Sequence, residues 1–182
     1  MTQTAVKQIV LASRPKGPPT PENFRLEEVP MPALPPGGLL LRVLYLSLDP
    51  YMRGRMDDRK SYAKHVDIGA VMTGESVCEV IASDRPGYAE GDIVLAHTGW
   101  RTHAAWDGTG PALRKLDPAL APITTGLGVL GMPGFTAYAG LYVIGKPKAG
   151  ETVVAAAASG PVGSLVGQLA KMAGAVRKSA VM

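Results

Sequence analysis

The stretch TVVAAAASGPVGSLVGQLAKMA, residues 152–173, decides the fold of the C-terminal part of this sequence. Residues 152–158 form a continuous apolar run of strand length, which is typical of a parallel strand covered on both faces. Gly160 and Pro161 then open a helix, in which apolar residues recur at three- and four-residue spacing. A strand, a glycine turn and a helix in this order predict the opening of a βαβ unit.

The turn between this strand and this helix has the pattern A-x-x-G-x-x-G, formed by Ala157, Ala158, Ser159, Gly160, Pro161, Val162 and Gly163. Glycines let the backbone approach a pyrophosphate, and the helix that follows offers unpaired N–H groups to the anion. In this context the turn predicts a dinucleotide site. The alternative is tight packing of helix on strand in a protein that binds no nucleotide.

The residues after this helix depart from the pattern of a buried second strand. Arg177 and Lys178 stand where that strand should be buried, and buried cations are costly unless they are paired. We therefore expect a solvated, frayed tail at this end of the chain. The residue that reads the ribose should follow the turn by about 20 residues. Because that point is the end of the chain, the motif alone does not distinguish NAD from NADP.

Residues 1–130 predict a separate, β-rich domain. Short apolar segments lie at 6–11, 24–29, 39–48, 71–82, 92–96 and 100–106. Turns rich in Gly and Pro separate them, which indicates a small barrel or sandwich. Gly74 is expected at a bulge or a close-packing point. Residues 131–182 would then hold a junction helix, beginning near Pro133 or Gly134, and the start of the nucleotide-binding domain.

Eight of the 16 prolines fall between residues 14 and 38. Prolines at strand ends and edges account for this crowding. A proline-rich ligand for an SH3-like partner is the alternative.

Composition and charge exclude several classes of protein. The 182 residues carry a net charge of +4 without a run of five like charges, so a nucleic-acid arm is not indicated. One cysteine, Cys78, excludes a disulfide framework and a multi-cysteine zinc site. The three histidines show no zinc-ligand spacing. The basic cluster of Arg53, Arg55, Arg59, Lys60 and Lys64 lacks interleaved aromatic residues and is expected to be a solvated active-site loop.

Two uncharged stretches, residues 119–145 and 152–170, are long enough to span a bilayer if they are helical. Their many Gly, Ala and Pro residues give little transfer free energy, so burial within a soluble protein is the preferred interpretation. No basic region followed by an apolar run opens the chain. We expect a cytoplasmic protein without a membrane or nucleic-acid partner.

Residues 49–56, DPYMRGRM, resemble a segment of the zinc-independent medium-chain dehydrogenases/reductases. The branch is that of prostaglandin reductase (leukotriene B4 12-hydroxydehydrogenase), plant double-bond reductases and bacterial curcumin reductase. Three further segments carry the resemblance: MTGESVCEVIASDRPGYAEGDIV (72–94), GMPGFTAYAGL (131–141) and PKAGETVVAAAASGPVGSLVGQLAK (147–171). It extends over about residues 6–174, and Cys78 stands in it where a glycine is usual.

This resemblance implies an α/β chain with a GroES-like N-terminal barrel, followed by the first βα unit of a Rossmann-type domain. It implies NADPH-dependent reduction of the C=C bond of α,β-unsaturated aldehydes and ketones, by hydride transfer to the β-carbon. The activity would belong to the complete protein, a homodimer, of which this chain would be the N-terminal half. The alternatives are a stand-alone barrel that acts by binding, with a vestigial nucleotide motif, and an interaction or membrane-associated protein.

The resemblance also implies roles for individual residues. Tyr51 would bind substrate and donate a hydrogen bond to the carbonyl oxygen, where charge develops in the transition state. From the residues alone, a barrel-rim aromatic is the alternative for Tyr51. Pro50 would lie at the nicotinamide side, and Met132 and Thr136 near the nicotinamide ribose, unless these two only pack at the domain junction. The turn 157–163 would hold the pyrophosphate, and no metal site is implied.

Overall fold

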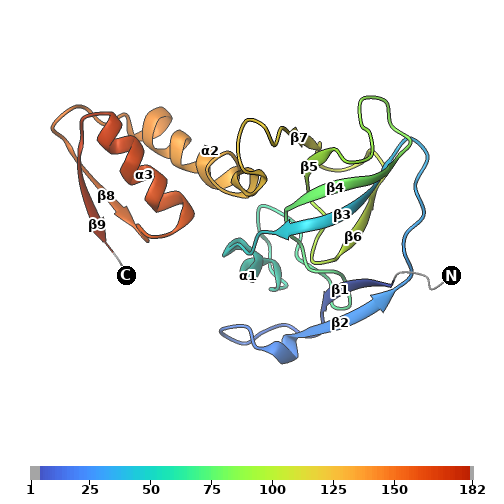
Figure 1. The fold of residues 1–182 in the computed structure, drawn as a ribbon. Helices are drawn as coiled ribbons and strands as arrows, with labels where there is room; N and C mark the ends of the chain where they lie inside the picture. The colour runs from blue at the N-terminus through green and yellow to red at the C-terminus, as the bar shows by residue number, and fades with distance from the viewer. Residues whose placement is uncertain (1–4, 181–182) are drawn as a thin grey trace. The chain divides into compact units, whose positions relative to one another are not determined.

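The computed structural model describes residues 5–180, and the chain divides into two compact units, Met1–Ile123 and Thr124–Met182 (Figure 1). The sequence interpretation places this division between residues 130 and 131. Each unit is described by itself.

The first unit consists of antiparallel strands and few helical residues. The hairpin of β1 (Val6–Leu11) and β2 (Phe24–Val29) contains the short helix η1 (Pro21–Asn23). The larger sheet has the order β6-β3-β4-β5-β7. Its strands are β3 (Leu39–Leu46), β4 (Ser76–Ser83), β5 (Ile93–Ala96), β6 (His103–Trp106) and β7 (Arg114–Leu116). The sequence analysis missed β7, because Arg114 and Lys115 give it no apolar pattern.

The core of this unit follows from strand alternation, which sends every second side chain to the same face. One buried cluster comprises Leu39, Leu41, Cys78, Val80, Val94 and Ala96. A second cluster comprises Leu11, Met56, Val66 and Met72, with Phe24 stacked on Trp100 beside it. Residues of β1 and of the segment around α1 (Tyr51–Arg55) therefore share one core.

Gly74 is the close-packing point that the sequence predicts. A Cβ at this position would lie 2.8 Å from Cδ1 of Leu46 and 3.3 Å from Cε of Met52. Strand β4 begins two residues later, at Ser76, whose hydroxyl accepts a buried hydrogen bond from Thr98 at 2.8 Å.

The second unit contains the predicted strand, turn and helix. The helix η2 (Ile123–Leu127) begins at the last residue of the first unit and continues into the second. The other elements of the second unit are α2 (Met132–Tyr138), the π-helical η3 (Ala139–Gly145), β8 (Thr152–Ala156), α3 (Pro161–Met172) and β9 (Val176–Ala180). Helix α3 packs on both strands and on α2, and it lies on one side of the β8–β9 pair (Figure 1). Together with the first unit, this confirms the predicted fold class.

The expectation of a frayed tail is wrong for residues 176–180. They form β9, which pairs in parallel with β8 from Thr152↔Val176 to Ala156↔Ala180. The ladder uses backbone N–H and C=O groups, which any residue except proline supplies. Residues 181 and 182 lie outside the described part of the chain.

Within the described residues, no helix is long and apolar enough to cross a membrane. The uncharged stretch 119–145 is divided among η2, α2 and η3, and residues 152–170 are divided between β8 and α3.

Candidate functional site

Tyr51 is the first residue of the short helix α1. Asp49 and Pro50 precede it, and their carbonyls accept the backbone N–H groups of Met52 and Arg53 at 3.0 and 3.1 Å. At the other end, Arg14 donates to the Met56 carbonyl at 2.7 Å, and Val66 N–H donates to the Arg55 carbonyl at 2.7 Å. Segments distant in sequence thus hold the C-terminal end of the helix.

The hydroxyl of Tyr51 lies in a polar surrounding but remains protonated. Tyr51 is half-buried, and burial is the main reason that its pKa is raised above 10. The carboxylates of Asp49 and Glu75 raise it further, while a hydrogen bond with Thr73 and the charge of Arg55 oppose them. At neutral pH the phenol is therefore a hydrogen-bond donor.

A second pair of polar side chains, Glu75 and His97, lies just before β4 begins and just after β5 ends. Ser76 pairs with Ala96 in the β4–β5 ladder, so the residues just beyond, Glu75 and His97, face each other. His97 Nε2 lies 3.6 Å from Glu75 Oε1. Burial raises the pKa of Glu75, while His97 and Arg114 lower it and Asp49 raises it slightly. The sequence analysis missed this pair, and the only available signal was a charged residue directly before a buried strand.

Arg55 contacts two aromatic rings. Its guanidinium carbon lies 5.7 Å from the ring centre of Tyr51 and 4.6 Å from that of Tyr62. The expectation that no aromatic residue stands among these cations is wrong, because Tyr62 lies between Lys60 and Lys64 in the sequence. Tyr62 belongs to a loop whose residues 58–65 line a hollow of about 540 Å³.

Other cations of the basic cluster form ion pairs. Arg53 pairs with Asp57 at 2.6 Å, and Lys64 pairs with Asp67 at 2.8 Å. Arg59 lies 3.5 Å from Asp57 and is largely exposed. These pairs at the surface agree with the expected solvated loop.

The glycine turn of the second unit is tightly closed. Ala157 has φ +48°, in the left-handed region, and its carbonyl accepts the N–H of Gly160 at 2.9 Å. A Cβ at Gly163 would lie 2.5 Å from this carbonyl oxygen, so only glycine fits there. Pro161 begins α3, and the first N–H groups of a helix have no partner within the helix. The close approach at Gly163 fits both a phosphate-binding turn and the alternative of tight packing of helix on strand, so the pyrophosphate site stays a prediction.

Met132 and Thr136 lie one turn apart on α2, and both are exposed. The hydroxyl of Thr136 donates to the Met132 carbonyl at 2.8 Å. This hydroxyl is therefore engaged within its own helix, as it would be in a purely structural role.

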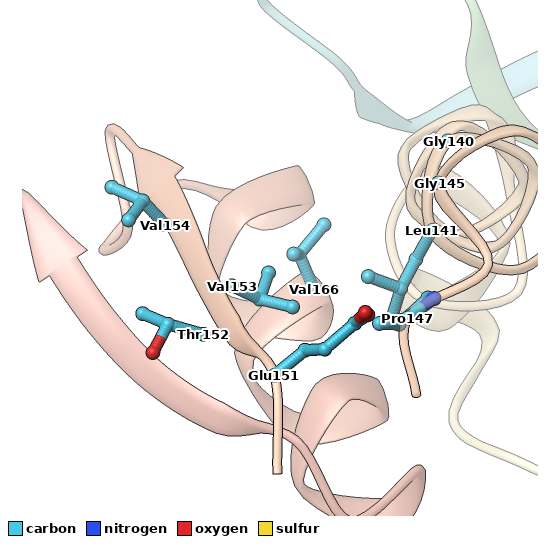
Figure 2. A pocket seen from close by; sticks show the side chains of 9 residues that line it. All are labelled: Gly140, Leu141, Gly145, Pro147, Glu151, Thr152, Val153, Val154 and Val166. Carbon is cyan, nitrogen blue, oxygen red and sulfur yellow. The ribbon is translucent and has the colours of Figure 1, made fainter. Parts of the chain in front are cut away.

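A hollow of about 350 Å³ lies within the second unit, beside β8, α3 and η3. Figure 2 shows Val153, Val166 and Leu141 directed toward it, whereas Val154 points to the other side of β8. Glu151 at its rim accepts the backbone N–H of Lys148 at 2.8 Å. None of the predicted site residues lines this hollow.

Within residues 5–180, no group of three or more His, Cys, Asp or Glu side chains is arranged to hold a metal ion. His65 lies 3.1 Å from Asp67, and His103 contacts the hydroxyl of Thr102. Cys78 is fully buried, and burial raises the pKa of its thiol to about 12.

Residues 7–113 match the family described as the N-terminal domain of oxidoreductase. The chain is 55% identical over 165 residues to the NADPH-dependent curcumin reductase of Escherichia coli, covering 91% of this chain and 47% of that protein. It is 44% identical over 164 residues to prostaglandin reductase 1 of Bos taurus, covering 87% of this chain and 46% of that protein. The 2-alkenal reductase (NADP(+)-dependent) of Nicotiana tabacum is 40% identical over 172 residues, a match that covers 92% of this chain and 50% of that protein.

Among solved structures, CurA from Vibrio vulnificus in complex with NADPH is 52% identical, with a TM-score of 0.89. The match covers 96% of this chain and 51% of that one. These likenesses confirm the predicted GroES-like domain and the start of a Rossmann-type domain. The chain spans about half the length of the curated relatives it matches.

Proposed function

Because the chain belongs to the oxidoreductase family that this N-terminal domain defines, we propose that it is the N-terminal half of an NADPH-dependent reductase of α,β-unsaturated aldehydes and ketones. The relatives whose names specify NADPH or NADP support the cofactor. The name 2-alkenal reductase supports the class of substrate.

The observation that carries this proposal is the state of Tyr51. Reduction of the C=C bond of an enone places negative charge on the carbonyl oxygen, as an enolate. A neutral phenol can donate a hydrogen bond to that oxygen, and the bond strengthens as the charge develops. Like any tyrosine, Tyr51 is protonated at neutral pH, and burial raises its pKa further, while the Arg55 guanidinium carbon lies 5.7 Å from its ring centre. Tyr51 would thus stabilise the transition state more than the bound substrate.

The turn 157–163 would hold the pyrophosphate of NADPH. Gly163 lets the first turn of α3 approach the Ala157 carbonyl closely, and the N-terminal N–H groups of α3 lie at this turn. Pro50 would lie at the nicotinamide side, and Met132 and Thr136 near the nicotinamide ribose. When bound, NADPH supplies the hydride for the β-carbon.

The test is Tyr51→Phe in the complete protein. We expect kcat for an enone to fall about 100-fold, as when one donor to a developing oxyanion is removed, while the Kd for NADPH changes less than twofold. Tyr45→Phe is the matched control, because Tyr45 is an exposed tyrosine on β3 and should retain full activity. Stopped-flow measurement of NADPH oxidation gives kcat, and fluorescence titration gives the Kd. An unchanged kcat in Tyr51→Phe would remove Tyr51 from the mechanism.

The homodimer that the resemblance implies and the cytoplasmic location that the sequence predicts stay predictions. Sedimentation velocity of the complete protein tests the first, with a mass of one chain as the contradicting result. Fractionation of cells tests the second.

A further inference from the structure

We propose that Arg55 is a positioning residue for Tyr51, and that the ring of Tyr62 holds Arg55 in place. This inference rests on the proposed function, because it concerns how the proposed donor is oriented. It assigns a role to one cation of the basic cluster that the sequence predicts to be a solvated active-site loop.

The first step is the geometry of α1. Tyr51 and Arg55 are four residues apart in this helix, so their side chains lie on the same face. The guanidinium carbon of Arg55 lies 5.7 Å from the Tyr51 ring centre, within the range of a cation–π contact. A helix of five residues gives little rigidity by itself. The contact therefore limits the rotation of the Tyr51 ring where the helix alone would not.

The second step is the contact with Tyr62. This ring belongs to the loop after α1 and is 84% exposed, yet its centre lies 4.6 Å from the Arg55 guanidinium carbon. An exposed tyrosine gains little from burial, so the contact with this cation helps to keep the ring in this position. Arg55 thus connects the Tyr51 ring to the loop of residues 58–65.

The third step is the contrast with the neighbouring arginines. Arg53 donates to Asp57 and to the carbonyl of Gly17, and Arg14 donates to the carbonyl of Met56. Their contacts hold the helix against its surroundings. Arg55 instead directs its charge toward the rings, and its cation opposes the rise in the pKa of Tyr51. Only Arg55 among these three is placed to act on the phenol.

The first experiment uses the 182-residue chain and needs no activity. With 3-fluorotyrosine incorporated, 19F NMR follows the ionisation of Tyr51, which is assigned by the resonance missing in Tyr51→Phe. We expect Arg55→Met to raise the pKa of Tyr51 and to broaden or shift its resonance, and Arg55→Lys to restore the pKa. Arg59→Met is the matched control, because Arg59 lies in the loop after α1 and pairs with Asp57. This variant should change neither the pKa nor the resonance of Tyr51.

The second experiment measures kcat and KM in the complete protein. Arg55→Met should lower kcat about three- to tenfold, the scale of a cation–π contact, with KM changed less than twofold. Tyr62→Leu should lower kcat through the same contact, so that the double variant Arg55→Met/Tyr62→Leu falls no further than Arg55→Met. Tyr62→Phe keeps the ring and should retain most of kcat.

Two results would overturn the inference. One is an Arg55→Met chain whose Tyr51 resonance and pKa equal those of the parent, provided that its circular dichroism and Tm show a folded chain. The other is additive loss in the double variant, which would give Tyr62 a role independent of Arg55. If Tyr51→Phe keeps full kcat, the proposed function of Tyr51 fails, while the 19F experiment still decides whether Arg55 positions the ring.

Discussion

At the scale of single residues, the environment decides what each reactive group can do. Tyr51 and Cys78 both have a raised pKa because they are buried, yet only Tyr51 lies beside polar and charged groups. Cys78 lies in the apolar cluster between β3, β4 and β5. The same physical cause thus raises both pKa values, but it changes the chemistry at neutral pH only for the thiol, because a phenol is protonated there in any case.

Cys78 should react with thiol reagents only when the β-rich unit unfolds. A thiol with a pKa of about 12 carries almost no thiolate at pH 8, and the fully buried sulfur is inaccessible. Labelling with 5,5′-dithiobis(2-nitrobenzoate) should therefore be slow in buffer and rise with urea in parallel with the loss of circular dichroism. Rapid labelling of the folded chain would contradict the buried position.

Glu75→Gln should stabilise the chain at pH 7 but not at pH 4. The pKa of Glu75 is raised in the folded state, so the folded chain holds this proton more tightly than the unfolded one. The carboxyl therefore costs stability as pH rises above its ordinary value of 4.5, and below about pH 4 it is protonated in both states. The Tm of Glu75→Gln should match the parent at pH 4 and exceed it at pH 7.

His97→Gln is the control for this pH dependence, because it removes the partner and keeps the carboxyl. His97 lowers the pKa of Glu75, so its removal should steepen the loss of stability with pH. Differential scanning calorimetry from pH 4 to pH 8 measures both variants. Equal Tm differences at all pH values would show that Glu75 is not desolvated.

At the scale of elements, tight backbone approaches shape the turn between β8 and α3. Gly163 is required by the nearby Ala157 carbonyl, whereas Ala157 itself is strained, because φ +48° is unfavourable for a residue with a Cβ. The Ala157 side chain is exposed and contributes little packing. The turn therefore holds one residue that must be glycine and one that would be better as glycine.

Ala157→Gly should raise the free energy of unfolding of the second unit by about 0.5–1 kcal/mol. Glycine removes the cost of the left-handed conformation, which exceeds its greater loss of backbone entropy. Ala155→Gly is the matched control, since Ala155 lies within β8 in ordinary strand conformation. This variant should be less stable than the parent chain. Amide exchange of α3 under native conditions measures both. A lower stability of Ala157→Gly would contradict the strain.

At the scale of the whole molecule, the two units differ in how completely they bury their strands. In the first unit β3 and β4 each have a neighbour on both sides. In the described part of the second unit, β8 pairs only with β9, and Val154 is 65% exposed. Parallel strands are normally covered on both faces. The open face of β8 fits a chain that spans about half the length of its relatives.

Amide hydrogen exchange should separate the two units in the 182-residue chain. We expect amides of β3 and β4 to exchange on the order of 100-fold more slowly than those of β8, because the latter open without unfolding the first unit. Mass spectrometry of peptic peptides covering 39–46, 76–83 and 152–156 measures the difference. Equal protection would show that the units unfold together.

The sequence by itself determined what depends on neighbours along the chain. Strand alternation, the glycine turn and helical spacing predict most of the β strands, including β8, and the helix α3. Residues 49–56, which include Tyr51, carry the resemblance to the family that the chain matches. Only the tertiary structure decided that Tyr62 lies on Arg55, that Glu75 faces His97 and that residues 176–180 pair with β8. Local patterns record how a segment buries its own side chains. Contacts across space depend on register and turn geometry, which distant segments set together.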